Sequence, residues 1–349
     1  MSECEKLPPD MSRRASPPLA VAVFGVSTPF CYWGFHLVRE IVQAIGGSTV
    51  CLHVLALQDL REGLGRRGNR SVVITSDLPS SDLAGVILSY GLPVIFFADD
   101  PDTVFDWAVE SRGLTCADGA RFCSRLGSAL APTVSAVRKL FVARSRDLSP
   151  AGIVADVVEF LWPGRSQRLA AQTYEILVES GKIGAGPPPR SGDTTGAREG
   201  EQTELRTVVA AYCELLLGRP PGEIDWPLPL FTRPDGRPWR DPIDLAGPAR
   251  ALLYGPYMHL PVGDWTARVE FEIFGALSGV EATTDVRIGE VVTEKALVLP
   301  ANGVFAYDLG FDIRDPHQPV EIRLFLRKAA IEGVFLLRSV KVRLRRGPA

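Results

Sequence analysis

VAVFGVSTPFCYWGFHLVREIV, residues 21–42, decides the fold of the first half of the chain. Its start belongs to a continuous apolar run over 19–26, which is typical of a strand covered on both faces. Its end has the apolar spacing of a helix, which we place at 34–45. A strand, a loop and a helix in this order are the setting of a phosphate-binding site. The loop expected between them, residues 27–32, has no basic residue and no glycine, so the sequence predicts the frame of an anion site without its chemistry.

Strands and helices continue to alternate after this stretch. Further strands are predicted at the apolar runs 50–57, 71–76, 93–98 and 137–143. Further helices are predicted at 80–90, 102–112, 119–130 and 149–161. Such alternation is typical of a parallel sheet whose faces are covered by helices. We therefore predict an α/β domain over 19–183.

The second half of the chain has a different pattern. Residues 184–202 are rich in Gly, Pro, Ser and charge, and they predict a flexible linker. A helix at 203–218 is expected within a connecting segment, 203–223. Apolar and polar residues then alternate strictly at 265–273, 320–327 and 339–346. Strands with one apolar face and one solvent-exposed face predict an antiparallel, jelly-roll-like β-sandwich over 224–349.

Bulk composition narrows the class of protein. The 349 residues carry a formal net charge of −3 at pH 7, which gives no global attraction to nucleic acid. The six cysteines form no CxxC pair and no cluster with histidine, which argues against a metal site or a disulfide framework. No apolar run has the length of a membrane span, and residues 1–18 have acids where a secretory signal needs bases. We expect a disordered arm at 1–18 on a cytoplasmic protein without an integral membrane segment.

Four segments of the first half, in order, resemble the P-loop sulfotransferase family. The opening stretch is similar to that family's strand, PKSGTTW-like loop and helix. Residues 72–83 are similar to its KTHLP segment, residues 93–107 to its strand and RDPRDVxxS motif, and residues 142–164 to its late strand, EDL turn and FLG-ended helix. Together they span about residues 19–164. The resemblance implies a P-loop-like α/β fold that holds a 3′,5′-phosphorylated adenosine cofactor.

The loop positions that would hold the 5′-phosphate depart from the family. Thr28 stands at the basic position, Phe30 at the glycine, and Cys31 and Tyr32 at the hydroxyl positions. Anions need positive charge and close approach to backbone amides, which an aromatic side chain at the glycine position blocks. We expect Phe30 to fill the vacated cofactor site by packing; a new ligand platform at this aromatic loop is the alternative.

The remaining cofactor and catalytic positions depart as well. Thr75 stands at the lysine that faces the sulfate, and Asp77 at the general-base histidine. Asp99 and Trp107 stand at the arginine and serine that hold the 3′-phosphate. Acids at Asp99 and its neighbours repel an anion and are better explained as the cap and first turn of the next helix. The sequence therefore predicts a pseudoenzyme without cofactor or metal, in which Asp77 is the one weak catalytic candidate.

Aromatic residues concentrate in the second domain at ARALLYGPYMHLPVGDW, residues 249–265. This stretch is similar to one in small β-sandwich modules of bacterial proteins, some of them attached to sugar-handling domains. Sugar-binding sandwiches present aromatic faces beside polar groups. Tyr254, Tyr257 and His259 are therefore our candidate ligand-binding residues, with Trp265 expected in the core. The alternative is that Tyr257 plugs one end of the sandwich.

These observations favour a non-catalytic binding or assembly protein. The resemblances point to bacterial cell-surface or exported polysaccharide production, with a glycan or a polysaccharide-synthesis protein as partner. One alternative is an active sulfo- or glycosyl-type transferase with a rebuilt donor site and Asp77 as base. The other is an oligomeric scaffold whose sandwich pairs with itself or with a partner.

Overall fold

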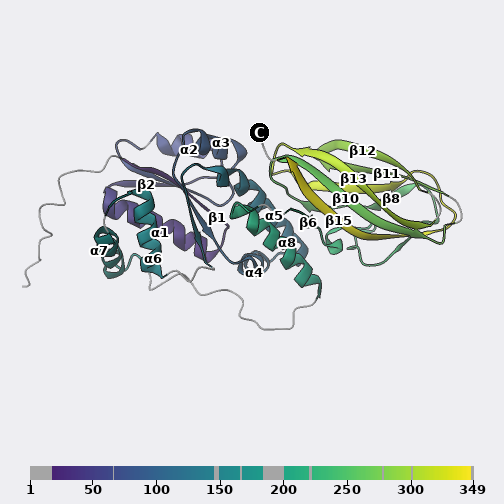
Figure 1. Cartoon of the computed structure of the whole chain (residues 1–349), viewed down its shortest axis with the longest axis horizontal. Coiled ribbons are helices and arrows are strands. Elements are labelled where there is room, and N and C mark those ends of the chain that lie inside the picture. Colours follow the sequence, from purple (N-terminus) through teal and green to yellow (C-terminus); the bar gives the residue numbers. More distant parts are fainter. Residues whose placement is uncertain are drawn as a thin grey trace, which may run out of the picture. The chain divides into compact units, whose positions relative to one another are not determined.

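The computed structural model describes residues 18–65, 67–144, 149–165, 167–183, 200–219, 222–276, 279–299 and 302–346. The chain forms two compact units, one of residues 1–99 and 136–189, the other of residues 100–135 and 190–349 (Figure 1). The predicted arm and linker lie almost entirely outside the described residues, and the domain boundaries drawn from the sequence stay predictions. Of the helices that the structure describes, none combines the length and apolar character needed to cross a membrane.

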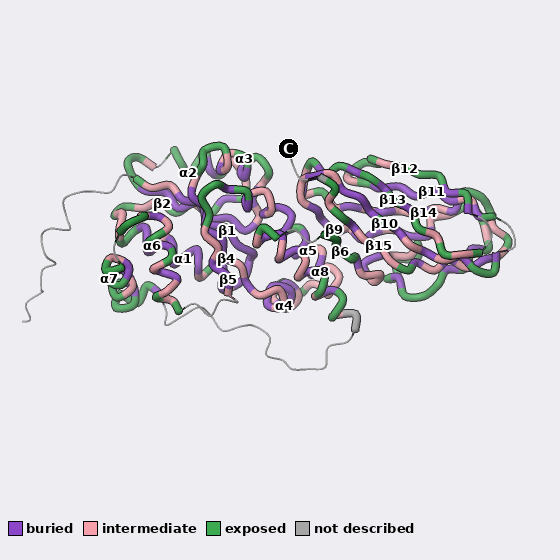
Figure 2. The backbone as a smooth tube through the Cα atoms, in the orientation of Figure 1, coloured by how far each residue is buried: buried purple, intermediate pink, exposed green. Residues whose placement is uncertain are grey.

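A parallel five-stranded sheet forms the centre of the first unit. Its strands are β1 (Ala20–Gly25), β2 (Thr49–His53), β3 (Ser71–Ser76), β4 (Val94–Ala98) and β5 (Lys139–Ala143). Their order is β2-β3-β1-β4-β5, and every neighbouring pair is parallel. The central strands are buried along their length, as Figure 2 shows, because their continuous apolar runs face helices or other packed side chains on both sides. The predicted parallel α/β sheet is confirmed.

The helices of the first unit largely begin at side chains that cap them. They are α1 (Pro29–Gly46), α2 (Leu57–Leu64), α3 (Ser81–Ser89), α6 (Pro150–Leu161) and α7 (Gln167–Glu179). Thr28, Ser80 and Ser149 each accept a hydrogen bond from a first-turn backbone N–H. The strand predicted over 50–57 was too long: it ends at His53, and the chain enters α2 instead.

The loop predicted over 27–32 is wrong, because α1 already begins at Pro29. Thr28 is the N-cap and accepts from the Cys31 N–H at 3.4 Å, while Pro29 suits the first helical position, whose N–H needs no partner. Only Val26, Ser27 and Thr28 connect β1 to the helix. Phe30 therefore lies in the first helical turn rather than in a loop that could wrap an anion.

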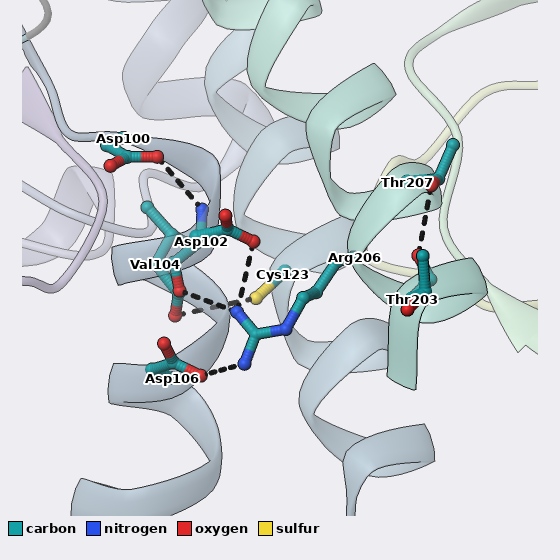
Figure 3. A network of polar contacts seen from close by, with 8 residues as sticks. All are labelled: Asp100, Asp102, Val104, Asp106, Cys123, Thr203, Arg206 and Thr207. Atoms are coloured by element: carbon teal, nitrogen blue, oxygen red, sulfur yellow. Dashed lines mark hydrogen bonds and ion pairs between the residues drawn. The ribbon is translucent and has the colours of Figure 1, made fainter. Parts of the chain in front are cut away.

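Helices also belong to the second unit: α4 (Pro101–Arg112), α5 (Cys116–Leu130), the short 3₁₀ helix η2 (Ala131–Ser135) and α8 (Gly200–Leu216). Asp100 caps α4 and accepts from the Asp102 N–H at 3.2 Å, as expected for acids that begin a helix. Arg206 of α8 reaches α4, where its guanidinium donates to Asp102 Oδ1 at 3.0 Å and to Asp106 (Figure 3). These ion pairs fix α8 against α4.

Two antiparallel sheets make up the rest of the second unit. One has the order β13-β10-β15-β6, with β7 also on β15, and the other the order β12-β11-β14-β8, with β9 also on β14. The strands of the first are β6 (Ile224–Asp225), β7 (Ile243–Asp244), β10 (Gly263–Phe274), β13 (Gly303–Ile313) and β15 (Val334–Arg346). Those of the second are β8 (Arg250–Leu253), β9 (Pro256–Met258), β11 (Val280–Ile288), β12 (Glu290–Leu299) and β14 (Val320–Leu326). The antiparallel arrangement predicted for this half is confirmed, and it is consistent with a β-sandwich.

The core between these sheets follows the predicted alternation. Trp265, Val269 and Phe271 of β10 are buried, whereas Arg268 between them is exposed. A polar contact joins the sheets inside the core, where Tyr307 Oη donates to Thr284 Oγ1 at 3.0 Å. Each sheet therefore keeps one face for the core and one for other contacts.

Helix α5 is hydrogen-bonded to β9 and to two segments beside the second sheet. Arg121 donates from Nε to the Pro256 carbonyl and from Nη2 to the Leu230 carbonyl, both at 2.9 Å. Ser124 Oγ accepts from the His259 N–H at 3.0 Å. These contacts with α5 fix the position of the segment around Tyr257.

Candidate functional site

The carboxyl edge of the parallel sheet is the first place to look for a site, because open α/β sheets bind ligands there. Asp77 follows β3 directly, and its Oδ2 accepts from Ser27 Oγ at 2.5 Å and from Tyr32 Oη at 3.0 Å. His53 Nε2 lies 3.9 Å from the other carboxylate oxygen. Two hydroxyl donors already occupy the oxygen that a general base would use, so the geometry does not favour proton abstraction by Asp77.

The neighbouring part of this edge is filled by Phe30 and a buried ion pair. Asp99 follows β4, and both its oxygens lie 3.3 Å from Arg144 Nη1. The Arg144 guanidinium lies 5.4 Å from the centre of the Phe30 ring, which is 1% exposed. Phe30 also stacks on Trp33 at 6.0 Å and meets Phe97 edge-on at 5.8 Å. Aromatic packing thus occupies the position at which the resemblance would have a glycine.

The other residues predicted around a degenerate cofactor site have structural contacts. Cys31 is buried, its Sγ lies 3.1 Å from the Phe97 carbonyl, and burial raises the pKa of its thiol to about 12, so it is not a thiolate at neutral pH. Thr75 is buried and donates to the Leu52 carbonyl at 3.4 Å. Trp107 lies in α4 of the second unit, where the Arg112 guanidinium is 5.0 Å from its ring. Among the described residues, no group of three or more His, Cys, Asp or Glu could hold a metal ion.

The outer face of the second sheet presents a different set of side chains. Along β14, Ile322 and Leu324 are buried in the core, and Arg323 and Phe325 lie on the opposite face. Arg323 pairs in register with Asp285 of β11 and donates two hydrogen bonds to its carboxylate, Nε to Oδ1 at 2.8 Å and Nη2 to Oδ2 at 2.7 Å. The hydrogen-bonded Asp285 raises the pKa of Arg323 above its ordinary value. The pair is therefore a charged, orientated group on this face.

Aromatic rings lie directly beside that pair. The ring of Tyr254 meets the ring of Phe325 edge-on, with centroids 6.5 Å apart and planes at 85°. The Arg323 guanidinium lies 5.2 Å from the Phe325 centroid. Both rings are half-buried, so each keeps surface for a ligand. Backbone hydrogen bonds between Tyr254 and Thr232, at 2.7 and 3.0 Å, fix the chain that carries the tyrosine.

A buried hydroxyl without a partner lies next to Phe325. Thr283 of β11 is opposite Phe325 in the register and two residues from Asp285, so the three side chains share one face. Thr283 is 7% exposed, and among the described residues its Oγ1 has no hydrogen-bond partner. Buried polar groups are normally satisfied, so this hydroxyl is an exception beneath the outer surface of the sheet, beside Phe325.

Tyr257 borders the same face at its end. Its backbone has a φ of 63°, so the short strand β9 departs from extended geometry at this residue. Its hydroxyl donates to Glu321 Oε1 of β14 at 2.9 Å, and the Arg121 guanidinium lies 5.6 Å from its ring. Burial and the hydrogen-bonded Glu321 raise the pKa of Tyr257 to about 12. Its hydroxyl and one side of its ring are thus engaged within the protein.

His259 is not brought together with the two tyrosines. It is 8% exposed, and its Nδ1 lies 3.0 Å from the Pro316 carbonyl. Burial lowers its pKa to about 4, so the ring is neutral at pH 7. The structure thus places Tyr254 and Tyr257 along one sheet face, with His259 inside the fold.

Sequence reasoning missed Phe325, Arg323, Asp285 and Thr283. One signal was present: within the alternating stretch VEIRLFL, residues 320–326, Phe325 is an apolar residue at an outward position. An aromatic side chain that faces solvent beside other aromatic residues, here Tyr254, can contribute to a ligand-binding patch. The pairing of β14 with β11 brings Asp285 and Thr283 next to Arg323 and Phe325. The alternation of apolar and polar residues along each strand does not predict which strands pair.

Comparisons with known proteins give weak matches in structure alone. No protein-family model and no curated protein matches the sequence. One similar solved structure is TmCBM61 in complex with β-1,4-galactotriose, with 13% identity over 30% of this chain and 69% of that chain and a TM-score of 0.23. The C-terminal domain of EclA, a sugar-binding protein, matches with 18% identity over 34% of this chain and 89% of that chain and a TM-score of 0.24. Infectious bursal disease virus, Gx strain, matches with 10% identity over 32% of this chain and 35% of that chain and a TM-score of 0.22. These TM-scores are low and one fold serves many functions, so what the protein binds must be read from its own residues.

Proposed function

We propose that this protein is a non-catalytic binding protein whose second unit binds glycan on the outer face of the β11–β14–β8 sheet. The observation that carries the proposal is the aromatic pair Tyr254 and Phe325 beside the doubly hydrogen-bonded pair Arg323 and Asp285. Sugar rings present C–H-rich faces that stack on aromatic side chains, and hydroxyls that need orientated polar groups next to them.

The polar groups of this face are suited to hydroxyl recognition. Arg323 and Asp285 hold each other in one geometry, so little conformational entropy is lost when a ligand binds. A guanidinium has five N–H donors and a carboxylate has about four acceptor sites, which leaves capacity beyond the mutual pair.

The first unit supports the non-catalytic part of the proposal. Its strand-to-helix connection is short, and Phe30 and the Asp99–Arg144 pair fill the edge of the sheet. Asp77 is held by two hydroxyl groups. We assign this unit an assembly role, in contact with a polysaccharide-synthesis protein in bacterial cell-surface or exported polysaccharide production. The cysteines that the structure describes are free thiols, which suits the proposed cytoplasmic location.

A binding screen with the full-length protein tests the proposal. Ligand-observed NMR against neutral bacterial polysaccharides should give saturation transfer for at least one glycan, and Phe325→Ala should reduce it, because one stacking contact is worth about 0.5–1.5 kcal/mol. Tyr90→Ala is the matched control, because Tyr90 is an aromatic residue of the first unit that is 78% exposed. No transfer from any glycan would refute glycan binding and favour the sandwich as a protein-docking or self-pairing module. Equal transfer for wild type and Phe325→Ala would place any glycan elsewhere.

A further inference from the structure

A polar pocket lies on the other sheet, away from the residues of the proposed glycan face. It has a volume of about 540 Å³ and is lined by Thr266, Asp308, Gly310, Arg343, Leu344 and Arg345. Pockets that bind small ligands typically have volumes of about 300–1,000 Å³. The lining comes from β10, β13 and β15, none of which carries Phe325 or Arg323.

The pocket is built by a row of residues across three strands. Gly310 of β13 pairs with Thr266 of β10, and Thr266 pairs with Arg343 of β15. The glycine leaves the space: a Cβ atom at Gly310 would lie 2.9 Å from Nη1 of Arg345. A glycine inside a strand often marks close approach by another group, and here the arginine and the open volume share that space.

A β-bulge directs Arg345 toward this glycine. Trp265 pairs with Leu344 and Asp264 pairs with Arg346, so the register shifts between them and Arg345 has no partner residue on β10. Bulges of this kind turn one side chain away from the regular alternation and are common next to functional sites. The bulge therefore brings a second arginine to the pocket beside Arg343.

Of the arginines in and beside the pocket, Arg268 and Arg345 each lie near a carboxylate, and Arg343 lies near none among the described residues. Asp308 lies 3.6 Å from Arg268, and Asp264 lies 3.9 Å from Arg345. For Arg343, the part of the chain that the structure describes offers no carboxylate within ion-pair distance. A ligand with one negative charge would complete the set, and the planar guanidinium fork matches a carboxylate.

Asp308 restricts the ligand further. Its carboxylate would repel a doubly charged anion such as phosphate at close range, but it accepts hydrogen bonds from hydroxyl groups. The Thr266 hydroxyl lies between Gly310 and Arg343 in the row and adds a second hydroxyl partner. Within the described ranges of the chain, no aromatic side chain lines this pocket, so binding here depends on charge and hydrogen bonds and not on stacking.

From this geometry we propose that the pocket binds a uronate residue, with its carboxylate on Arg343 and Arg345 and its hydroxyls on Asp308 and Thr266. A uronate unites the required single charge with several hydroxyls in one ring. This site is separate from the proposed glycan face and does not depend on Phe325. It would allow the second unit to hold an acidic sugar on one sheet whether or not a glycan is bound on the other.

Calorimetry with the full-length protein tests this site. The probes are the trisaccharides of galacturonate, glucuronate and mannuronate, with neutral galactotriose, acetate and inorganic phosphate for comparison. At least one uronate should bind, and Arg343→Gln should weaken it by about tenfold or more, because hydrogen bonds to charged groups are the stronger ones. Arg237→Gln is the control, since Arg237 is an arginine of the same unit that is 79% exposed and lies outside the pocket. Thermal unfolding of each variant checks that it is folded.

The outcomes separate this proposal from the proposed glycan face. Phe325→Ala should leave uronate binding within about twofold, because surface changes away from a site have small effects. Failure of every uronate to bind, or equal affinity for wild type and Arg343→Gln, would overturn the uronate site even if a neutral glycan binds. Competition by acetate or phosphate at the concentrations at which the uronate binds would also overturn it and would identify a simple anion site.

Discussion

Arg323 and Asp285 face each other across β14 and β11 and share two hydrogen bonds, of 2.8 and 2.7 Å. Their side chains are 19% and 9% exposed, although both lie on the face of the sheet that is turned away from the core. An ion pair this shielded holds its geometry better than one in open solvent. The pair is therefore a fixed platform beside Phe325.

Breaking this pair should weaken the fold. Asp285→Asn removes the carboxylate and leaves Arg323 without its charged partner, and we expect a loss of about 2 kcal/mol in the free energy of unfolding. Urea denaturation measures it. Asp312→Asn is the control, because Asp312 pairs with Arg314, whose side chain is 91% exposed, and it should change stability by less than about 0.5 kcal/mol. Equal effects of the two variants would show that the Arg323–Asp285 pair does not hold the sheet face.

Phe30 should be a major contributor to the stability of the first unit. Its ring is 1% exposed and packs on Trp33 and Phe97, so Phe30→Ala leaves a cavity and should destabilise the protein by about 3 kcal/mol. Tyr32→Phe on the same helical turn is the comparison. Tyr32 is 44% exposed, and the change removes the hydroxyl that donates to Asp77 but keeps the ring. If the Phe30→Ala protein were as stable as the Tyr32→Phe protein, the claim that Phe30 packs into the carboxyl edge of the parallel sheet would be wrong.

Adenosine 3′,5′-bisphosphate should not bind. Micromolar affinity at millimolar ligand would add about 4 kcal/mol to the stability of the folded protein, which thermal unfolding detects easily. We expect no shift of the unfolding temperature up to millimolar concentrations, because Phe30 and Asp99 are packed together with Arg144 at the positions to which the sulfotransferase resemblance would assign the glycine and the arginine that hold the phosphates. A clear upward shift would restore the transferase alternative, with Asp77 as its base.

His259 should make stability depend on pH. Burial lowers its folded-state pKa from 6.5 to about 4, so the unfolded chain takes up the proton first as the pH falls. The contribution is complete above pH 6.5 and is lost between pH 6.5 and pH 4, by on the order of 3 kcal/mol in total. Urea denaturation of wild type and His259→Gln across this range measures it. A slope that is the same in both proteins would mean that other groups cause it.

The sequence could predict those elements whose burial is uniform. β3 coincides with the predicted strand 71–76, since all six of its residues are buried and apolar or small. Helix α2 was missed because LQDLREGL is short and polar and buries only Leu60. The loop at 27–32 was misread because Pro29, taken as a loop residue, is the first residue of a helix.

The candidate site was only partly predictable, for a physical reason. Tyr254 and Tyr257 were found because aromatic residues concentrate in one stretch of the sequence. Their neighbours on the sheet face, Asp285 and Phe325, come from strands far apart in the chain, and their register was not available. The contacts of Arg121 with Pro256 and Leu230 were also invisible, so a fragment limited to residues 224–349 would lose an anchor of the site. Binding tests therefore need the full chain.

Calorimetric titration of the bound glycan against Tyr254→Ala/Phe325→Ala tests the central claim most directly. Each stacking contact is worth about 0.5–1.5 kcal/mol beyond burial, so the double variant should bind about tenfold or more weakly than wild type. The control variant Tyr90→Ala should bind like wild type. Thermal unfolding should show that all three proteins are folded at 25 °C, the temperature of the titration. The account predicts this loss of affinity with an intact fold. A double variant that is folded and binds the glycan as tightly as wild type would contradict it.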